Sequence, residues 1–179
     1  MRRAFPRRLV SGGQTGVDRA ALDAALEAGL EAGGWCPRGR RAEDGAVPAR
    51  HPLREAPSPV YAVRTRLNVR DSDATLVLAW GPLRGGTALT LRWCRRLGRP
   101  CRLVDLSRAV APGELRALRR WLRRHRVRTL NVAGPREGER PGIQARALAF
   151  LRRLLAEGGR GRERCGGVET GPLRRHSCG

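Results

Sequence analysis

Apolar residues along the chain form two kinds of pattern, short continuous runs typical of buried strands and stripes with helical spacing. The first run, residues 8–11, predicts a short strand that ends at a pair of glycines. The stripe that follows predicts a helix that packs closely on a sheet and ends at Gly29; its members are Val17, Ala20, Ala21, Ala24, Ala25 and Ala28. Residues 75–80 are continuously apolar, as expected of a central parallel strand.

The rest of the chain continues this alternation. We expect strands around residues 34–36, 101–104 and 129–133, helices over residues 61–70, 113–125 and 143–156, and a helix opened by residues 81–87 that ends at Leu97. Residues 38–59 carry four prolines and predict a long loop, a kind of segment that is often functional. The repeated order of strand, glycine loop and helix predicts the α/β class: a single-domain, Rossmann-like, doubly wound and mostly parallel sheet with helices on both faces.

Two parts of the chain differ in composition. Residues 7–157 carry the periodic pattern and are expected to form one Rossmann-like ligand-binding domain. Residues 158–179 are rich in glycine and arginine without an apolar pattern, so we expect a disordered tail there. No secretory signal follows Met1 and no run of about 18 apolar residues occurs, which predicts a cytoplasmic protein without a membrane span. Five cysteines without metal-finger spacing are expected to be reduced thiols.

The charge of the chain first suggests a polyanionic partner, because the formal net charge is +21 and the pI is near 11.8. All 37 basic residues are arginines, however, which indicates a coding bias rather than a surface selected to follow a phosphate backbone. Aromatic residues make up 4% of the chain, too few for a platform that stacks single-stranded bases. We therefore expect weak attraction to anions of any kind. A nucleic-acid-binding protein is kept as a third hypothesis that rests on the net charge alone, after the two given below.

Three glycine-containing loops follow predicted strands, at residues 12–18, 81–87 and 134–142. Parallel strands end at one edge of a sheet, so these loops are expected to meet there. Glycines let backbone N–H groups approach a phosphate at the start of a helix, where the helix dipole adds positive potential. The residues predicted to bind the anion are Gly12, Gly13, Gln14, Thr15, Gly16, Gly85, Gly86, Thr87, Gly134, Pro135 and Arg136.

A phosphate site alone does not select a ligand, so a flat or apolar group has to be held as well. Trp35 and Trp80 each end a predicted strand and are candidates for a stacking wall, with an ordinary core position as the alternative. Asp18 lies in the first turn of its helix, where it either faces the ligand or complements the helix dipole. No nucleophile and base can be paired from the sequence, so no catalytic residue and no metal site is predicted.

Five ordered blocks carry a resemblance to a known family: SGGQTGVDRAALDAAL at residues 11–26, GGWCPRGRRAEDG at 33–45, RTRLNVRDSDATLVL at 64–78, GGTALT at 85–90 and LNVAGPREG at 130–138. Together they resemble the putative molybdenum carrier family, a circularly permuted branch of the Rossmann-like SLOG and lysine-decarboxylase-like superfamily. The resemblance covers about residues 8–157. The family more often has serine and an aromatic residue where this chain has Gly138 and Gln144.

The resemblance implies storage or transfer of molybdenum cofactor, a pterin dithiolene with a phosphate tail, by a homo-oligomer that serves molybdoenzymes or cofactor-insertion proteins. Cys36 is then a candidate to approach the metal, with a buried thiol as the alternative. A second hypothesis is an enzyme of the related phosphoribohydrolase type, which cleaves a nucleoside monophosphate, or a sensor of a nucleotide-derived ligand. The resemblance implies that the related active enzymes have a glutamate within one helical turn after the glycine pair. This chain has Thr87, Ala88, Leu89 and Thr90 at these positions and therefore no acidic residue there.

Overall fold

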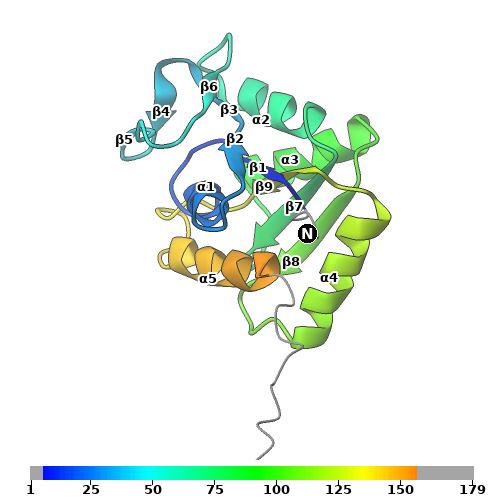
Figure 1. The fold of residues 1–179 in the computed structure, drawn as a ribbon. Helices are drawn as coiled ribbons and strands as arrows, with labels where there is room; N and C mark the ends of the chain where they lie inside the picture. Colours follow the sequence, from blue (N-terminus) through cyan, green and yellow to red (C-terminus); the bar gives the residue numbers. More distant parts are fainter. Residues whose placement is uncertain (1–5, 157–179) are drawn as a thin grey trace, which may run out of the picture.

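The computed structural model describes residues 6–156, which form a parallel sheet between two layers of helices (Figure 1). Within this range five strands build the sheet: β1 (Arg8–Val10), β2 (Glu31–Gly33), β7 (Ala74–Ala79), β8 (Cys101–Asp105) and β9 (Thr129–Ala133). Their spatial order is β2-β1-β9-β7-β8, and every neighbouring pair is parallel. The expected α/β, Rossmann-like, doubly wound fold is confirmed.

The strand order decides which loops become neighbours. The chain moves outward from β1 to the edge strand β2 and later from β7 to the other edge strand β8, and β9 then returns to the centre between β1 and β7. The strand order therefore reverses at the centre of the sheet, which is where doubly wound proteins bind ligands. The loops that follow β1, β9 and β7 are the three glycine loops, and they share the carboxyl edge.

Helices cover both faces of the sheet. They are α1 (Val17–Glu27), α2 (Tyr61–Arg70), α3 (Gly85–Arg96), α4 (Pro112–Arg124) and α5 (Ile143–Leu155). The larger apolar core joins α1, α4 and α5 to one face, through sheet residues such as Leu9, Leu76 and Leu130. Helices α2 and α3 pack against each other on the opposite face (Figure 1). Five members of the predicted stripe, Val17, Ala20, Ala21, Ala24 and Ala25, are buried and let α1 pack closely against the sheet and α5, whereas Ala28 is exposed and follows the last residue of the helix.

The strand expected around residues 34–36 is two separate strands. Residues 31–33 form β2 of the main sheet, and β3 (Trp35–Cys36) leaves that sheet to pair with β6 (Arg54–Glu55). Gly34 makes the break possible, because its φ is +124° and a Cβ there would lie 2.3 Å from the carbonyl oxygen of Ser11. Only glycine tolerates both conditions.

Residues 38–59, expected as a long loop, form a covering segment with structure of its own. It contains the 3₁₀ turn η1 (Arg38–Arg40), the antiparallel pair β4 (Arg41–Ala42) and β5 (Gly45–Ala46), and β6. Its residues Val47 and Leu53 pack with Leu22 of α1 and with Cys36 in a second, smaller core. The covering segment therefore sits over the first glycine loop and α1 (Figure 1).

The expected disordered tail, residues 158–179, lies outside the described residues, as do Cys165, Cys178 and the first five residues. Among residues 6–156, the helices are all too short or too polar to cross a bilayer.

Candidate functional site

The second glycine loop carries exposed backbone N–H groups at the start of a helix. Strand β7 ends at Ala79, and α3 begins at Gly85, which has a φ of +50° and is exposed together with Gly86. Within residues 6–156, the N–H groups of Gly85 and Gly86 donate no hydrogen bond to the protein. A Cβ on Gly86 would meet open space. These two donors, with the α3 dipole behind them, face solvent and are suited to an anion.

A hollow of about 400 Å³ lies beside these glycines. This volume is within the range of small-molecule sites. Its wall is formed by the end of β7, the loop before α3 and the third glycine loop; the lining residues are Ala79, Trp80, Pro82, Leu83, Arg84, Gly85, Thr87, Pro135, Glu139 and Arg140. The Arg146 guanidinium lies 4.5 Å from the centre of the Trp80 ring, so α5 supports this tryptophan.

A smaller hollow of about 150 Å³ adjoins the first, and the two share Thr87 and Glu139. It lies between α2, α3 and the ends of β1 and β9, and its lining includes Gln14, Tyr61, Thr65, Gly86, Gly134 and Arg136. Arg64 and Asp18 also line it and form a buried ion pair, with 3.0 Å between Nη1 and Oδ2. The Arg136 guanidinium lies 4.8 Å from the Tyr61 ring centre. The two hollows adjoin to form one cleft at the carboxyl edge, lined by arginines, by the acidic residues Asp18 and Glu139 and by apolar groups.

The first glycine loop is closed by other parts of the protein at Gly12, Gly13 and Gly16. A Cβ on Gly12 would overlap the Arg64 guanidinium, and a Cβ on Gly13 would lie 2.5 Å from Leu53 of the covering segment. At Gly16 it would lie 2.5 Å from the carbonyl oxygen of Pro135 in the third loop. The glycines here let three segments of the protein approach the loop. The space that was expected for a ligand is occupied by the protein itself.

The polar groups of the first loop are also bonded internally. The Gln14 side chain donates to the Arg41 carbonyl oxygen at 2.8 Å and accepts from the Glu43 N–H at 3.2 Å, which fixes the covering segment. The N–H of Gln14 donates to Asp18 Oδ2, and that of Gly16 donates to Gln144 Oε1. In this arrangement Gln14 has a structural role rather than donating to a ligand.

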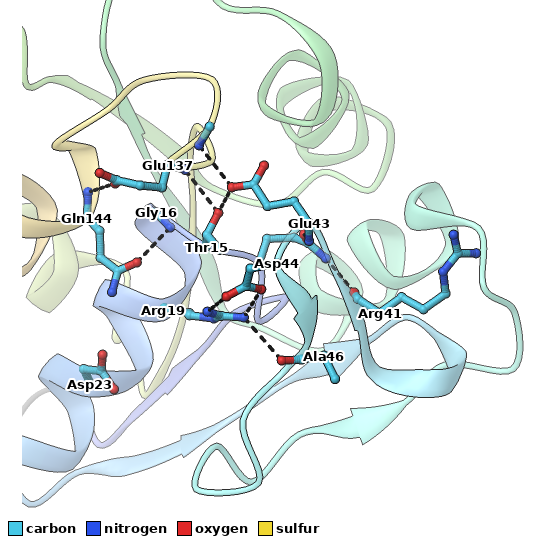
Figure 2. A network of polar contacts seen from close by, with 12 residues as sticks. Thr15, Gly16, Arg19, Asp23, Arg41, Glu43, Asp44, Ala46, Glu137 and Gln144 are labelled. Atoms are coloured by element: carbon cyan, nitrogen blue, oxygen red, sulfur yellow. Dashed lines mark hydrogen bonds and ion pairs between the residues drawn. The ribbon is translucent and has the colours of Figure 1, made fainter.

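Carboxylates occupy the donors of the third loop (Figure 2). The N–H groups of Gly142 and Gln144, at the start of α5, donate to the two carboxylate oxygens of Glu137. The N–H of Gly138 donates to Glu43 Oε1 at 3.0 Å, and the Thr15 hydroxyl donates to the same oxygen. The α5 N-terminus is therefore capped by the protein, so the open donors are those of α3.

The structure divides the predicted site residues into two groups. Those that line the two joined hollows are Gln14, Asp18, Trp80, Gly85, Gly86, Thr87, Gly134, Pro135 and Arg136. Gly12, Gly13, Thr15 and Gly16 lie beneath the covering segment and the third loop. Trp35 is separate from Trp80, because its indole N–H donates to Asp71 and it lines a different, small hollow with Arg8 and Arg54. The two tryptophans do not form one wall.

The sequence analysis did not single out four charged residues that line the cleft: Arg64, Arg84, Glu139 and Arg140. Arg64 reaches the cleft from α2, 46 positions after Asp18, so no local spacing links the pair. Glu139 and Arg140 follow Arg136 in the third loop, and their position after β9 was the one available clue. Among the described residues, no group of three or more His, Cys, Asp or Glu side chains could hold a metal ion.

Cys36 lies away from the cleft, in the second core. Its side chain is fully buried and its thiol is 3.4 Å from the Arg54 carbonyl oxygen. Burial raises the pKa of this thiol, so the reactive thiolate is disfavoured. The alternative of a buried structural thiol describes Cys36 in this structure.

Comparisons with known proteins agree with this architecture. The crystal structure of a protein named "Putative molybdenum carrier protein" from Syntrophus aciditrophicus SB is 41% identical in sequence, with a TM-score of 0.82; the match covers 86% of this chain and 97% of that one. No curated protein matches the chain. The model of the circularly permutated YpsA SLOG family matches residues 9–155, nearly the whole described range. With its strand order and its matched length, the chain belongs to the circularly permutated YpsA SLOG family.

Proposed function

We propose that this protein binds and carries a phosphate-bearing small molecule, with molybdenum cofactor as the first candidate. One observation carries the proposal: the exposed N–H groups at the start of α3 open onto the two joined hollows, that of Gly85 onto the 400 Å³ hollow lined by Trp80, Arg84 and Arg140, and that of Gly86 onto the smaller one. The name of the Syntrophus protein, a molybdenum carrier, adds to this choice of ligand.

Different residues of the hollow are suited to bind the different chemical groups of such a ligand. A phosphate on the α3 N-terminus meets two backbone donors and the Thr87 hydroxyl, with arginines at the rim. Charge-assisted hydrogen bonds contribute about 1.5–3 kcal/mol each, so three give roughly 5–9 kcal/mol before the costs of association. Micromolar affinity needs about 8 kcal/mol net, so an added contact to a flat ring is required. Trp80, backed by Arg146, supplies that contact.

The molybdenum centre would be cargo held through the pterin and its phosphate. The hollow contains no cysteine among its described lining residues, and Cys36 is buried elsewhere. We infer that the guanidinium groups of Arg136 and Arg140 face the oxygen atoms of the metal centre as hydrogen-bond donors, without a protein ligand on the metal.

Native mass spectrometry of freshly isolated protein tests the proposal directly, because a bound pterin dithiolene appears as a mass adduct. The Trp80→Ala and Arg140→Ala variants are expected to lose about tenfold in affinity each, since a stacking contact or a charge-assisted bond is about 1.4 kcal/mol or more. Trp35→Ala and Arg124→Ala are matched controls outside the hollow. No adduct with the wild-type protein, or equal losses in the controls, would contradict the proposal.

A phosphoribohydrolase is the second candidate, and Glu139 favours it. The sequence has no glutamate in the first turns of α3, yet the third loop places Glu139 Oε1 4.0 Å from the Cβ position of Gly85. A carboxylate beside a phosphate site is suited to general acid-base work on a glycosidic bond. Release of free base from AMP by the wild-type protein, abolished in Glu139→Gln, would establish this activity; no release by the wild-type protein would exclude it.

We also propose that the carrier is a cytoplasmic homo-oligomer that passes its ligand to molybdoenzymes or cofactor-insertion proteins. The support is the resemblance to a carrier family together with the open mouth of the hollow. Light scattering behind size exclusion measures the oligomer. A monomer at all concentrations would contradict this part without affecting ligand binding.

A further inference from the structure

The carboxylate of Glu43 occupies an unusual position in the covering segment. Glu43 is an exposed residue, yet its carboxylate turns inward to the junction of the first and third glycine loops (Figure 2). It accepts hydrogen bonds from the Thr15 hydroxyl and from the Gly138 N–H. A Cβ on Gly138 would lie 3.0 Å from Glu43 Oε2, so glycine at this position is what allows the carboxylate to approach.

The donors that hold this carboxylate resemble those of an oxyanion site. Thr15 is 8% exposed, and its Oγ1 also accepts the Glu137 N–H at 3.2 Å, so the direction of its own proton is fixed toward Glu43. A hydroxyl and a backbone N–H converging on one oxygen form the kind of site that binds a carboxylate or a phosphate oxygen. Here a side chain of the protein supplies that oxygen.

The backbone beside Glu43 is held independently of its carboxylate. Asp44 forms a two-pronged ion pair with Arg19, with distances of 2.5 and 2.7 Å, and Gln14 bonds the backbone of Arg41 and Glu43. The covering segment is therefore anchored by contacts other than the Glu43 carboxylate, so displacement of that carboxylate would leave these anchors in place.

We propose that Thr15 and Gly138 form a second oxyanion subsite, separate from the α3 N-terminus, and that Glu43 is a built-in competitor that an incoming phosphate group displaces. The subsite is suited to a tetrahedral oxyanion or a carboxylate group, because two neutral donors, the Thr15 hydroxyl and the Gly138 N–H, converge on one oxygen. Because Glu43 is attached to the protein, its carboxylate is present at a high local concentration, and the subsite is selective for anions that can compete with it. This subsite does not depend on the ligand proposed for the 400 Å³ hollow.

Titration of inorganic phosphate into the wild-type protein, Glu43→Gln and Glu43→Ala, by calorimetry at low salt, tests the proposal. We expect the wild-type protein to bind one phosphate, at the α3 N-terminus. The Glu43→Ala variant is expected to bind a second phosphate at the Thr15 and Gly138 subsite. The affinity of that subsite should rise about tenfold over the wild-type protein, which corresponds to one charge-assisted hydrogen bond. The Glu43→Gln variant, which keeps the shape without the charge, is expected to lie between them.

Two further variants separate this subsite from the site on α3. Adding Thr15→Val to Glu43→Ala is expected to remove the second phosphate and keep the first, whereas adding Arg84→Ala is expected to weaken the first and keep the second. An unchanged stoichiometry in Glu43→Ala, with the fold intact by circular dichroism, would overturn the proposal. If the wild-type protein binds no phosphate while Glu43→Ala binds one, the α3 site fails and the second subsite stands.

Discussion

The Arg64 guanidinium crosses the backbone of Gly12 to place its Nη1 3.0 Å from Asp18 Oδ2, and both side chains are almost entirely buried. The pair joins α2 to the start of α1 at the floor of the cleft. Gly12 permits the crossing because a Cβ there would overlap the guanidinium. The first glycine loop is thus built around an internal cation, which explains part of its glycine content without a ligand.

Removing one member of this pair is expected to be costly. Asp18→Asn leaves the buried Arg64 charge without its carboxylate, so we expect a loss of about 3 kcal/mol in the free energy of unfolding. The matched control is Glu27→Gln, which breaks the exposed Arg152 pair and should have a much smaller effect, because water screens this pair. Urea unfolding at pH 7 measures both, and equal effects would contradict the structural role of the buried pair.

Two glycines with positive φ should respond differently to alanine. Gly16 has a φ of +77° and a ψ of −131°, and a Cβ there would lie 2.5 Å from a backbone oxygen that cannot move away. Gly16→Ala is therefore expected to destabilise the protein by on the order of 3–5 kcal/mol. Gly29 has a φ of +66° but open space around it, so Gly29→Ala should cost about 1–2 kcal/mol. Thermal unfolding of both variants checks the order.

Arg40 is a structural arginine of the covering segment. Its guanidinium donates to the carbonyl oxygens of Val47, Pro48, His51 and Leu53 at 3.0–3.3 Å. Lysine cannot satisfy these acceptors because it has one ammonium group in place of a planar fork. We expect Arg40→Lys to increase hydrogen exchange in residues 47–56, with little change in α5. Unchanged exchange would show that the apolar contacts of Val47 and Leu53 suffice.

The Asp44 and Arg19 pair predicts a pH dependence. The hydrogen bond from Arg19 lowers the pKa of the Asp44 carboxyl below its ordinary value, so folding favours the ionised form. This contribution is present above the unfolded pKa near 4 and is lost as pH falls through the folded value. Asp44 is 47% exposed, which limits the loss in Asp44→Asn to about 1 kcal/mol at pH 7. The difference from the wild-type protein should shrink at pH 3.

Several arginines besides Arg40 bond to carbonyl oxygens within the fold. Arg119 donates to the last turn of α5, and Arg146 donates to Leu106. The net charge of +21 therefore overstates the positive charge that the surface offers to a polyanion. We expect duplex DNA to bind weakly and to dissociate by about 150 mM salt. Tight binding that survives this salt concentration would restore nucleic acid as a partner.

The sequence by itself determined the five helices and most strands of the main sheet, together with their order along the chain. The alanine stripe of α1, the apolar run of β7 and the glycines after the strands are local signals, and helix α2 and strand β9 have the predicted bounds. A parallel sheet brings the carboxyl ends of its strands to one edge, so the meeting of the three loops also followed from the pattern. These features depend on neighbouring residues and on general rules of chain topology.

Tertiary structure alone decided which loop stays open. Closure of the first loop depends on Arg64, Leu53 and Glu43, which come from segments with no spacing relationship to Gly12 or Thr15. The pairing of Trp35 with Asp71 likewise separates it from Trp80. Contacts between segments that are distant in the sequence therefore decide whether a glycine loop faces a ligand or the protein. Local sequence patterns do not predict such contacts.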